Sequence, residues 1–293
     1  MRASRARQAV FKLLVPLYLS FIPGIPLLVC VVPLLTLSAP ALRMGVLLVS
    51  PILYTLVYVV VAGLLSLPHQ DAIVAGRFPR QLGHPIYFHR RLYGLCWTAV
   101  FYFKPVFFLA LSFPLFKIIM FRLFGYRGSM DFTTYPDTWI RDLPLLDLGK
   151  GAYLSNRATI GTNIALPDGT ILVDKVKVGN GALVGHLCML APGAEIGDNS
   201  EVGAGCGIGL RTVVEEGVKI GPYCYIEHGV RIRAKARIGA WTYVRGGARI
   251  DERQSFSSGI VVPRKRRLSE ERAATGAVPD FADALPAVAF ETL

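Results

Sequence analysis

An aliphatic residue recurs at every sixth position through the second half of this chain. A period of six matches neither an amphipathic helix nor the two-residue alternation of a simple strand. It is typical of a hexapeptide solenoid, a parallel β-helix in which three flat faces make one triangular coil of about 18 residues. We expect this ladder of side chains to point inward and to stack from coil to coil. Its thirteen successive members are Val178, Val184, Leu190, Ile196, Val202, Ile208, Val214, Ile220, Ile226, Ile232, Ile238, Val244 and Ile250.

A second column of small or compact residues lies four positions after each aliphatic residue and supports the same register. We expect it to fill the crowded corners of the coils. Gly also follows the aliphatic residue directly at seven steps, where we expect the chain to turn and to need unusual dihedral angles. The column consists of Ala182, Cys188, Ala194, Ser200, Cys206, Thr212, Val218, Cys224, Val230, Ala236, Thr242 and Ala248, and the glycines are Gly179, Gly185, Gly197, Gly203, Gly209, Gly221 and Gly239.

Three of the five cysteines, Cys188, Cys206 and Cys224, belong to this column. Their spacing stacks them on successive coils about 4.8 Å apart, which a disulfide permits by distance alone. A cytoplasmic location argues against disulfides, and an inward column offers no point where thiolates converge on a metal ion. We therefore predict that these thiols fill the core and that the protein has no metal site.

The ladder starts before Val178 and is interrupted once. Leu148, Leu154 and Ile160 keep the period of six, and the stretch TNIALPDGTILVDKVK then breaks it. We expect this insertion to protrude as a loop, with turn residues at 167–169, on the face that solenoids use for binding. The predicted β-helix domain covers residues 131–251, and residues 252–293 are expected to form a C-terminal cap and a disordered tail.

The first half of the chain carries two long uncharged runs. The 30 residues between Lys12 and Arg43, and the 27 between Arg43 and Asp71, contain no charge. A membrane-spanning helix needs about 20 apolar residues, so these runs predict a helical hairpin within a membrane region over residues 1–130. Two buried core helices are the alternative.

A third apolar region, residues 92–124, is interrupted by Lys104-Pro105, Lys117 and Arg122. Pro105 disfavours a helical conformation at Lys104, so we interpret the region as interfacial helices or a re-entrant pair. A third and a fourth span are alternatives, and a single further span would move the C-terminal domain to the other side of the membrane.

The positive charge of the chain is confined to this helical region. The net charge is +12, and residues 1–130 hold 13 Lys and Arg against one acid. Positive charge around apolar sequence favours membrane lipids over nucleic acid as the partner. By the positive-inside rule, the basic flanks predict an integral protein of the bacterial inner membrane with its β-helix on the cytoplasmic side. These flanking residues are Arg2, Arg5, Arg7 and Lys12 before the hairpin, and Arg77, Arg80, Arg90 and Arg91 after it.

The repeat, of the form [LIV]-G-x-x-[small]-x, resembles that of the left-handed β-helix hexapeptide-repeat acyltransferase family over about residues 146–251. The stretches RLFGYRGSMDFTTYPDTWIRDLPLLDLGKGAYLSNRATIGTN and ILVDKVKVGNGALVG are also similar to the membrane C-terminal region of poly-lysine-type nonribosomal peptide synthetases. In those proteins membrane helices alternate with hexapeptide-repeat segments. The present sequence lacks the adenylation and carrier modules of the synthetases, so the likeness covers only their terminal architecture. The fold class expected is therefore an N-terminal α-helical membrane region followed by a left-handed parallel β-helix.

The family resemblance implies a homotrimer, with acyl-CoA in a cleft between prisms and a His as general base. Three of the five histidines lie in the basic loop near the membrane, which leaves His186 and His228. Each follows an inward aliphatic residue by two positions, and their spacing puts them on outward positions of different faces. The surroundings of His186, GHLCMLAPGAEIG, are similar to those in sugar N-acetyltransferases, so His186 is favoured. His228 is the alternate, with Glu227 to orient its ring, and a solvated or interface role is the alternative for both.

These observations predict a membrane-anchored acyltransferase. It would move an acyl group, in our interpretation acetyl, from acyl-CoA to a hydroxyl or amine of a membrane-proximal acceptor, with a carrier protein or a synthetase as a further partner. The alternative is a non-catalytic trimeric scaffold or gating module of a membrane-bound, nonribosomal-peptide-like assembly. Two departures from the family pattern favour this alternative. The insertion carries Asn163 where several relatives have a His, and the terminal G-N-P-A sequence of the family is missing.

Overall fold

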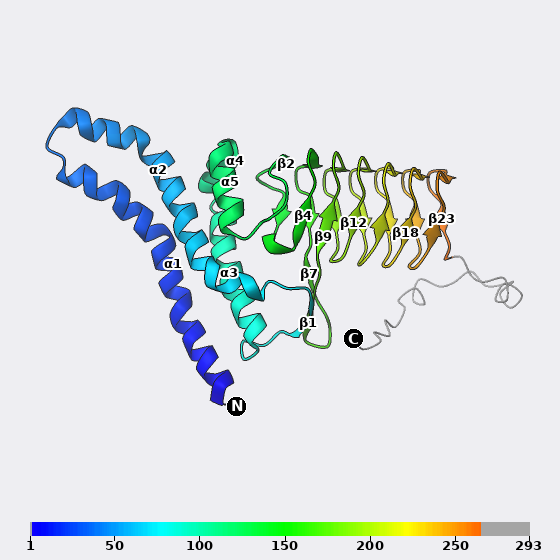
Figure 1. The fold of residues 1–293 in the computed structure, drawn as a ribbon, viewed down its shortest axis with the longest axis horizontal. Coiled ribbons are helices and arrows are strands. Elements are labelled where there is room, and N and C mark those ends of the chain that lie inside the picture. Colours follow the sequence, from blue (N-terminus) through cyan, green and yellow to red (C-terminus); the bar gives the residue numbers. More distant parts are fainter. Residues whose placement is uncertain (1, 265–293) are drawn as a thin grey trace, which may run out of the picture.

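Two long apolar helices open the chain and pack along each other as a hairpin (Figure 1). Helix α1 covers Arg2–Thr36 and contains four prolines, and α2 covers Pro40–Ser66 and continues into the 3-10 helix η1, Leu67–Ala72. The segments Ser4–Thr36 and Pro40–Ala72 are long and apolar enough to cross a membrane, and only 17% of the most apolar window of each is buried within the structure. The computed structural model describes residues 2–264, so the predicted C-terminal tail lies largely outside the described residues.

Three shorter helices join the hairpin to the second half of the chain. They are α3, Pro85–Tyr102, α4, Lys104–Ser112, and α5, Pro114–Leu123. Helices α3 and α4 meet at an angle of 80°, at the site where Pro105 restricts the preceding residue. The pair has the geometry of a broken span or a re-entrant loop, so it fits either the re-entrant pair or the alternative of a third span that the sequence left open.

The second half is a parallel β-solenoid of about seven turns, as predicted, and its axis runs away from the layer of helices (Figure 1). Strands 18 residues apart pair in parallel, as Val184 does with Val202. The first face contains β2 (Phe132–Thr134), β5 (Ala152–Leu154), β10 (Leu183–Val184), β13 (Glu201–Val202), β16 (Lys219–Ile220), β19 (Arg237–Ile238) and β22 (Ser255–Phe256). The second contains β3 (Trp139–Ile140), β6 (Thr159–Ile160), β11 (Met189–Leu190), β14 (Gly207–Ile208), β17 (Tyr225–Ile226), β20 (Tyr243–Val244) and β23 (Val261–Val262). The third contains β4 (Leu146–Leu148), which follows the 3-10 helix η2 (Leu143–Leu145), and β9 (Val176–Val178), β12 (Glu195–Ile196), β15 (Val213–Val214), β18 (Arg231–Ile232) and β21 (Arg249–Ile250).

The aliphatic ladder forms the core of the solenoid, as the period of six predicts. None of its thirteen members is more than 3% exposed, and the twelve residues of the small-residue column are also buried. Each buried Val, Leu or Ile contributes about 1.5–3 kcal/mol through burial. The five cysteines are free and buried, in agreement with a core-filling role for Cys188, Cys206 and Cys224.

The glycines that follow the ladder residues serve a different purpose from the one expected. They do not adopt left-handed dihedral angles; that conformation falls two positions later, at residues such as Leu187 (φ 58°), Arg211 (φ 51°) and Tyr223 (φ 57°). A Cβ at Gly197 would instead lie 2.5 Å from the carbonyl carbon of Glu215 on the next coil. The expectation of unusual dihedral angles was wrong, because the coils approach too closely there for any side chain.

The predicted protruding insertion is an antiparallel hairpin tied to the helical region. Leu148 pairs with Val178, a step of 30 residues instead of 18, so 12 extra residues leave the coil. They form β7, Asn163–Ala165, and β8, Thr170–Val173, and β8 also pairs with β1, Gly76–Pro79, from the segment between η1 and α3. These three strands lie below the first coils in Figure 1, and Arg77 and Asp168 form an ion pair across them.

The strands continue past the boundary expected at residue 251. Phe256 of β22 and Val262 of β23 occupy the next two steps of the ladder, at positions 256 and 262. Pairing of Ile238 with Phe256 and of Val244 with Val262 extends the first and second faces by one strand each. An aromatic residue at the ladder position hides this extension from a search for Val, Leu and Ile.

Candidate functional site

The three faces of the solenoid differ in the residues that they present to the outside. Outward residues of the first face include Glu201, Lys219 and Arg237, and those of the third include Lys177, Glu195, Arg231 and Arg249. On the second face, the outward residue before each ladder residue is uncharged: Trp139, Thr159, Met189, Gly207, Tyr225, Tyr243 and Val261. The charged Glu227 and Arg245 follow the ladder residues of β17 and β20. A row of outward residues without charge marks a surface for an apolar partner or ligand.

The corner between the first and second faces extends this apolar surface. The rings of Tyr223 and Trp241 stack with centroids 4.5 Å apart, and those of Tyr225 and Tyr243 stack at 5.7 Å. We call the exposed residues of this corner and of the second face the apolar strip. Its members, each at least half exposed, are Leu187, Met189, Tyr223, Tyr225, Trp241 and Val261.

His186 lies on the turn between β10 and β11, at the same corner as the strip and directly before Leu187. It is half-buried, and Gly205 donates a hydrogen bond to its carbonyl oxygen over 2.7 Å. Its ring makes no hydrogen bond within residues 2–264, so both ring nitrogens are available to a ligand. The sequence predicted an outward position on a face; the structure places His186 at a corner, because the turn occupies the residues directly after the inward aliphatic.

His228 lies at a different corner, between β17 on the second face and β18 on the third. It is exposed, and the backbone N–H of Leu210 on the preceding coil donates to its Nδ1 over 2.9 Å. A neutral imidazole that accepts at Nδ1 carries its proton on Nε2. The outward nitrogen of His228 is therefore a donor, which is the wrong state for a general base.

The carboxylate of Glu227 is not directed at the ring of His228. It accepts hydrogen bonds from the hydroxyl of Tyr243 and from the backbone N–H of Gly246, both on the following coil. Glu227 therefore links two coils, and the role of orienting His228 that the sequence suggested has no contact to support it.

The three membrane-side histidines lie apart from the solenoid. His69 is buried in η1, and its Nδ1 lies 2.9 Å from Nδ1 of His89 on α3. The hydroxyl of Tyr18 lies 3.2 Å from the other ring nitrogen of His69. Within residues 2–264 no group of three or more His, Cys, Asp or Glu is placed to hold a metal ion.

A buried ionic cluster where the helices meet the first coil was not foreseen from the sequence. The Arg90 guanidinium on α3 donates to Asp142 over 2.6 Å, and Thr162 and Asn163 donate to the same carboxylate oxygen over 2.8 and 2.9 Å. Burial opposes ionisation of Asp142, but Arg90, Arg141 and the bond from Thr162 outweigh it and hold its pKa below the ordinary value. Nothing in the periodicity marks Asp142, because it precedes the regular repeats.

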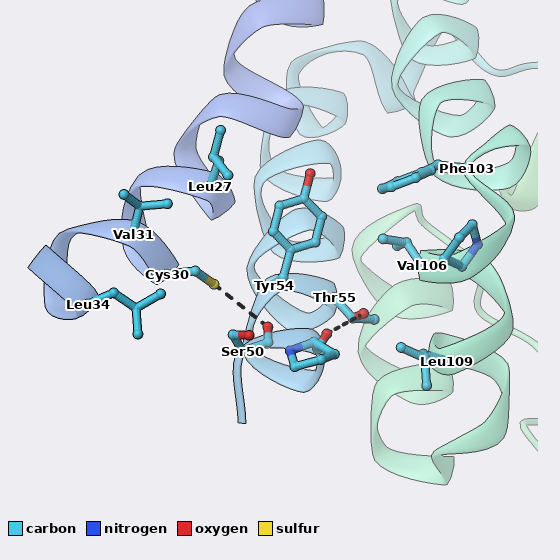
Figure 2. A pocket seen from close by; sticks show the side chains of 12 residues that line it. Leu27, Cys30, Val31, Leu34, Ser50, Tyr54, Thr55, Phe103, Val106 and Leu109 are labelled. Carbon is cyan, nitrogen blue, oxygen red and sulfur yellow. Dashed lines mark hydrogen bonds between the residues drawn. The ribbon is translucent and has the colours of Figure 1, made fainter. Parts of the chain in front are cut away.

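An apolar cavity of about 360 Å³ lies between the helices and is open to the surface (Figure 2). Its walls come from α1, α2 and α4 and include Leu27, Val31, Tyr54 and Val106. The hydroxyl of Thr55 donates to Pro51 within its own helix over 2.8 Å. Because the Thr55 hydroxyl already has a partner in its own helix, the cavity offers an environment suited to a hydrocarbon chain.

Comparisons with known proteins agree with this architecture. Residues 175–210 and 211–251 match the family described as bacterial transferase hexapeptide (six repeats). The comparison with curated proteins gave no match. The likeness to peptide synthetases remains an expectation from the sequence.

Several solved structures are similar to part of the chain. PerB from Caulobacter crescentus, in complex with CoA and GDP-perosamine, is 18% identical over 51% of this chain and 59% of its own, with a TM-score of 0.28. LpxA from Bacteroides fragilis 9343, a UDP-N-acetylglucosamine acyltransferase, is 17% identical over 40% of this chain and 51% of its own (TM-score 0.23). The acetyltransferase domain of PglB from Neisseria gonorrhoeae FA1090, in complex with acetyl coenzyme A, is 15% identical over 51% and 62% (TM-score 0.21). The chain thus spans only part of each of these structures, and such similarities do not assign it an activity.

Proposed function

We propose that this protein is a membrane-anchored acyltransferase. It transfers an acyl group, in the simplest case acetyl, from acyl-CoA or an acyl carrier protein to a hydroxyl or amine of an acceptor near the bilayer. The observation that carries the proposal is the free imidazole of His186 at the edge of the apolar strip, on a solenoid of hexapeptide repeats.

His186 is the general base in this proposal. Its imidazole accepts the proton of the acceptor hydroxyl or amine while the acceptor atom bonds to the thioester carbonyl carbon. The C–S bond then breaks, and the CoA thiolate takes the proton from the imidazolium. His228 is a poorer candidate because Leu210 already occupies its Nδ1.

The apolar strip supports a homotrimer in which the second face of one chain meets a neighbouring chain. Six half-exposed apolar side chains along one edge leave a surface that a monomer in water rarely keeps. Because His186 borders the strip, a cleft for acyl-CoA between two chains would lie beside it.

The α1–α2 hairpin supports the membrane anchor. Both helices expose apolar side chains along their length, among them Leu13, Leu28, Leu35 and Leu48. The basic residues flanking the hairpin favour the cytoplasmic side for the solenoid. The apolar cavity of Figure 2 is suited to a hydrocarbon chain of a lipid or of a lipid-linked acceptor.

The proposal is tested with the full chain purified in detergent. Binding of acetyl-CoA is measured by calorimetry, and transfer of a labelled acetyl group into a membrane lipid extract is followed in time. We expect His186→Ala to keep acetyl-CoA binding and to lower transfer by about 10²–10⁴-fold, while the matched variant His228→Ala keeps both.

Two results would contradict this assignment. Loss of transfer in His228→Ala with full activity in His186→Ala would move the base to the other corner. An assembled native protein that binds no acetyl-CoA would exclude acyl transfer and leave the non-catalytic scaffold or gating module as the function.

A further inference from the structure

A second cavity, of about 170 Å³, lies where α3, the first coil and the β7–β8 hairpin meet. It is much larger than the about 10–15 Å³ that a single water needs. Its polar lining consists of Arg80, Tyr87, Arg90, Arg91, Arg141 and Asn163. We call it the arginine pocket, since four guanidinium groups from three separate segments line it.

The pocket has an excess of positive charge. Asp142 is the acid that contacts these arginines, through Arg90 at 2.6 Å and Arg141 at 3.7 Å. Neither Arg80 nor Arg91 forms an ion pair within residues 2–264. Four cations against one carboxylate leave a formal charge of +3 around the cavity.

Part of the hydrogen-bonding capacity of the pocket is unused although it is buried. Arg90 is only 2% exposed, and its Nη2 binds Asp142 while its Nη1 has no partner among the described residues. The Nε of Arg141 also lacks a hydrogen bond, but it lies 3.7 Å from Oδ1 of Asp142, a buried acceptor that lacks one as well. A buried donor without a partner is costly, so Nη1 of Arg90 indicates a ligand that accepts hydrogen bonds.

A phosphate group fits these requirements. Guanidinium groups bind phosphate through paired N–H donors, and a phosphate ester brings several acceptor oxygens and up to two negative charges. A single carboxylate would leave more of the four arginines uncompensated. The hydroxyl of Tyr87 and the amide of Asn163 lie in the same lining and add neutral donors.

The pocket also lies at the basic end of the helical layer. Arg7, near the start of α1, donates to the carbonyl of Gly83, close before the residues of α3 that line the pocket. If the hairpin crosses a bilayer, this end is at the level of the lipid headgroups. We propose that the arginine pocket binds a phosphate ester, which a membrane lipid or a soluble metabolite can supply. This inference does not rest on acyl transfer.

The test uses the full chain in detergent, without any acyl donor. One arm titrates inorganic pyrophosphate by calorimetry. The other measures, by native mass spectrometry, binding of phosphatidic acid and of diacylglycerol with the same acyl chains. Arg91→Gln and Arg80→Gln remove exposed cations of the pocket, and Arg127→Gln is a matched control at an exposed arginine outside it.

We expect Arg91→Gln and Arg80→Gln each to weaken phosphate binding by about tenfold or more, with Arg127→Gln unchanged. Preference for phosphatidic acid over diacylglycerol, lost in the pocket variants, assigns the phosphate to a lipid. Binding of pyrophosphate alone, lost in the same variants, assigns it to a soluble ester. The proposal is overturned if the protein neither binds pyrophosphate nor prefers phosphatidic acid, or if Arg127→Gln weakens binding as much as the pocket variants do.

Discussion

Asp142 connects the helices to the solenoid at the residue scale. It is fully buried, takes a left-handed conformation (φ 53°), and accepts hydrogen bonds from Arg90, Thr162 and Asn163. Its charge therefore links α3 to the first coil and to the start of the insertion. Replacing one partner of such a pair leaves the other charged group buried and uncompensated.

We expect Asp142→Asn to destabilise the protein by about 3–5 kcal/mol. Because the pKa of Asp142 is lowered in the folded state, its ionised form stabilises the fold fully above the ordinary value of 3.8 and less as the pH falls below it. Thermal unfolding of the full chain at neutral and acidic pH measures both effects. Asp147→Asn, at an exposed position of β4, is the control, and equal melting temperatures for the two variants would contradict the account.

The site residues show what could be read from the sequence at this scale. The period of six and the family resemblance select His186 and His228 from five histidines. The resemblance favours His186, but the sequence does not show the bond from the backbone N–H of Leu210 on the preceding coil to Nδ1 of His228. Asp142 was missed since its partners, Arg90 and Thr162, are brought together only by the packing of α3 on the first coil.

At the level of the element, the solenoid depends on close contact between successive coils. The seven glycines that follow ladder residues lie where the next coil approaches closely, as Gly197 does against Glu215. We expect Gly197→Ala to destabilise the solenoid by about 1–3 kcal/mol, as overpacking does. Gly45→Ala is the matched control, because a Cβ there meets no atom within 4 Å and Ala favours a helix by about 0.5–1 kcal/mol. Thermal unfolding compares them, and equal losses in both variants would contradict the packing argument.

The elements themselves were largely predictable. The ladder, the small-residue column and the insertion are all predicted by the six-residue period, because each coil repeats the contacts of its neighbours. The pairing of β1 with β8 was not predictable, since Gly76–Pro79 has no strand pattern and lies far from the insertion in sequence. The step from Ile250 to Phe256 was missed because the inward position accepts an aromatic ring at the end of the stack.

At the level of the whole molecule, the apolar strip along the second face is the surface where chains would meet in the proposed trimer. We expect Tyr225→Glu to convert a trimer into monomers, because it places a charge in an apolar contact. Lys219→Glu, on the charged first face of a nearby strand, should leave the assembly intact. Mass measurement by light scattering in detergent distinguishes the two. A native chain that is already monomeric would refute the trimer.

The helical layer also covers one end of the solenoid. The indole of Trp97 donates to the carbonyl of Ile140 over 2.6 Å, and the hydroxyl of Tyr93 accepts from the N–H of Leu143 over 3.2 Å. Exposed strand edges otherwise invite pairing with another chain. Among the described residues, the coils at β22 and β23 form the other end of the stack. Because the helices cover the first coil, head-to-tail stacking of described coils into an open-ended fibre is blocked at that end.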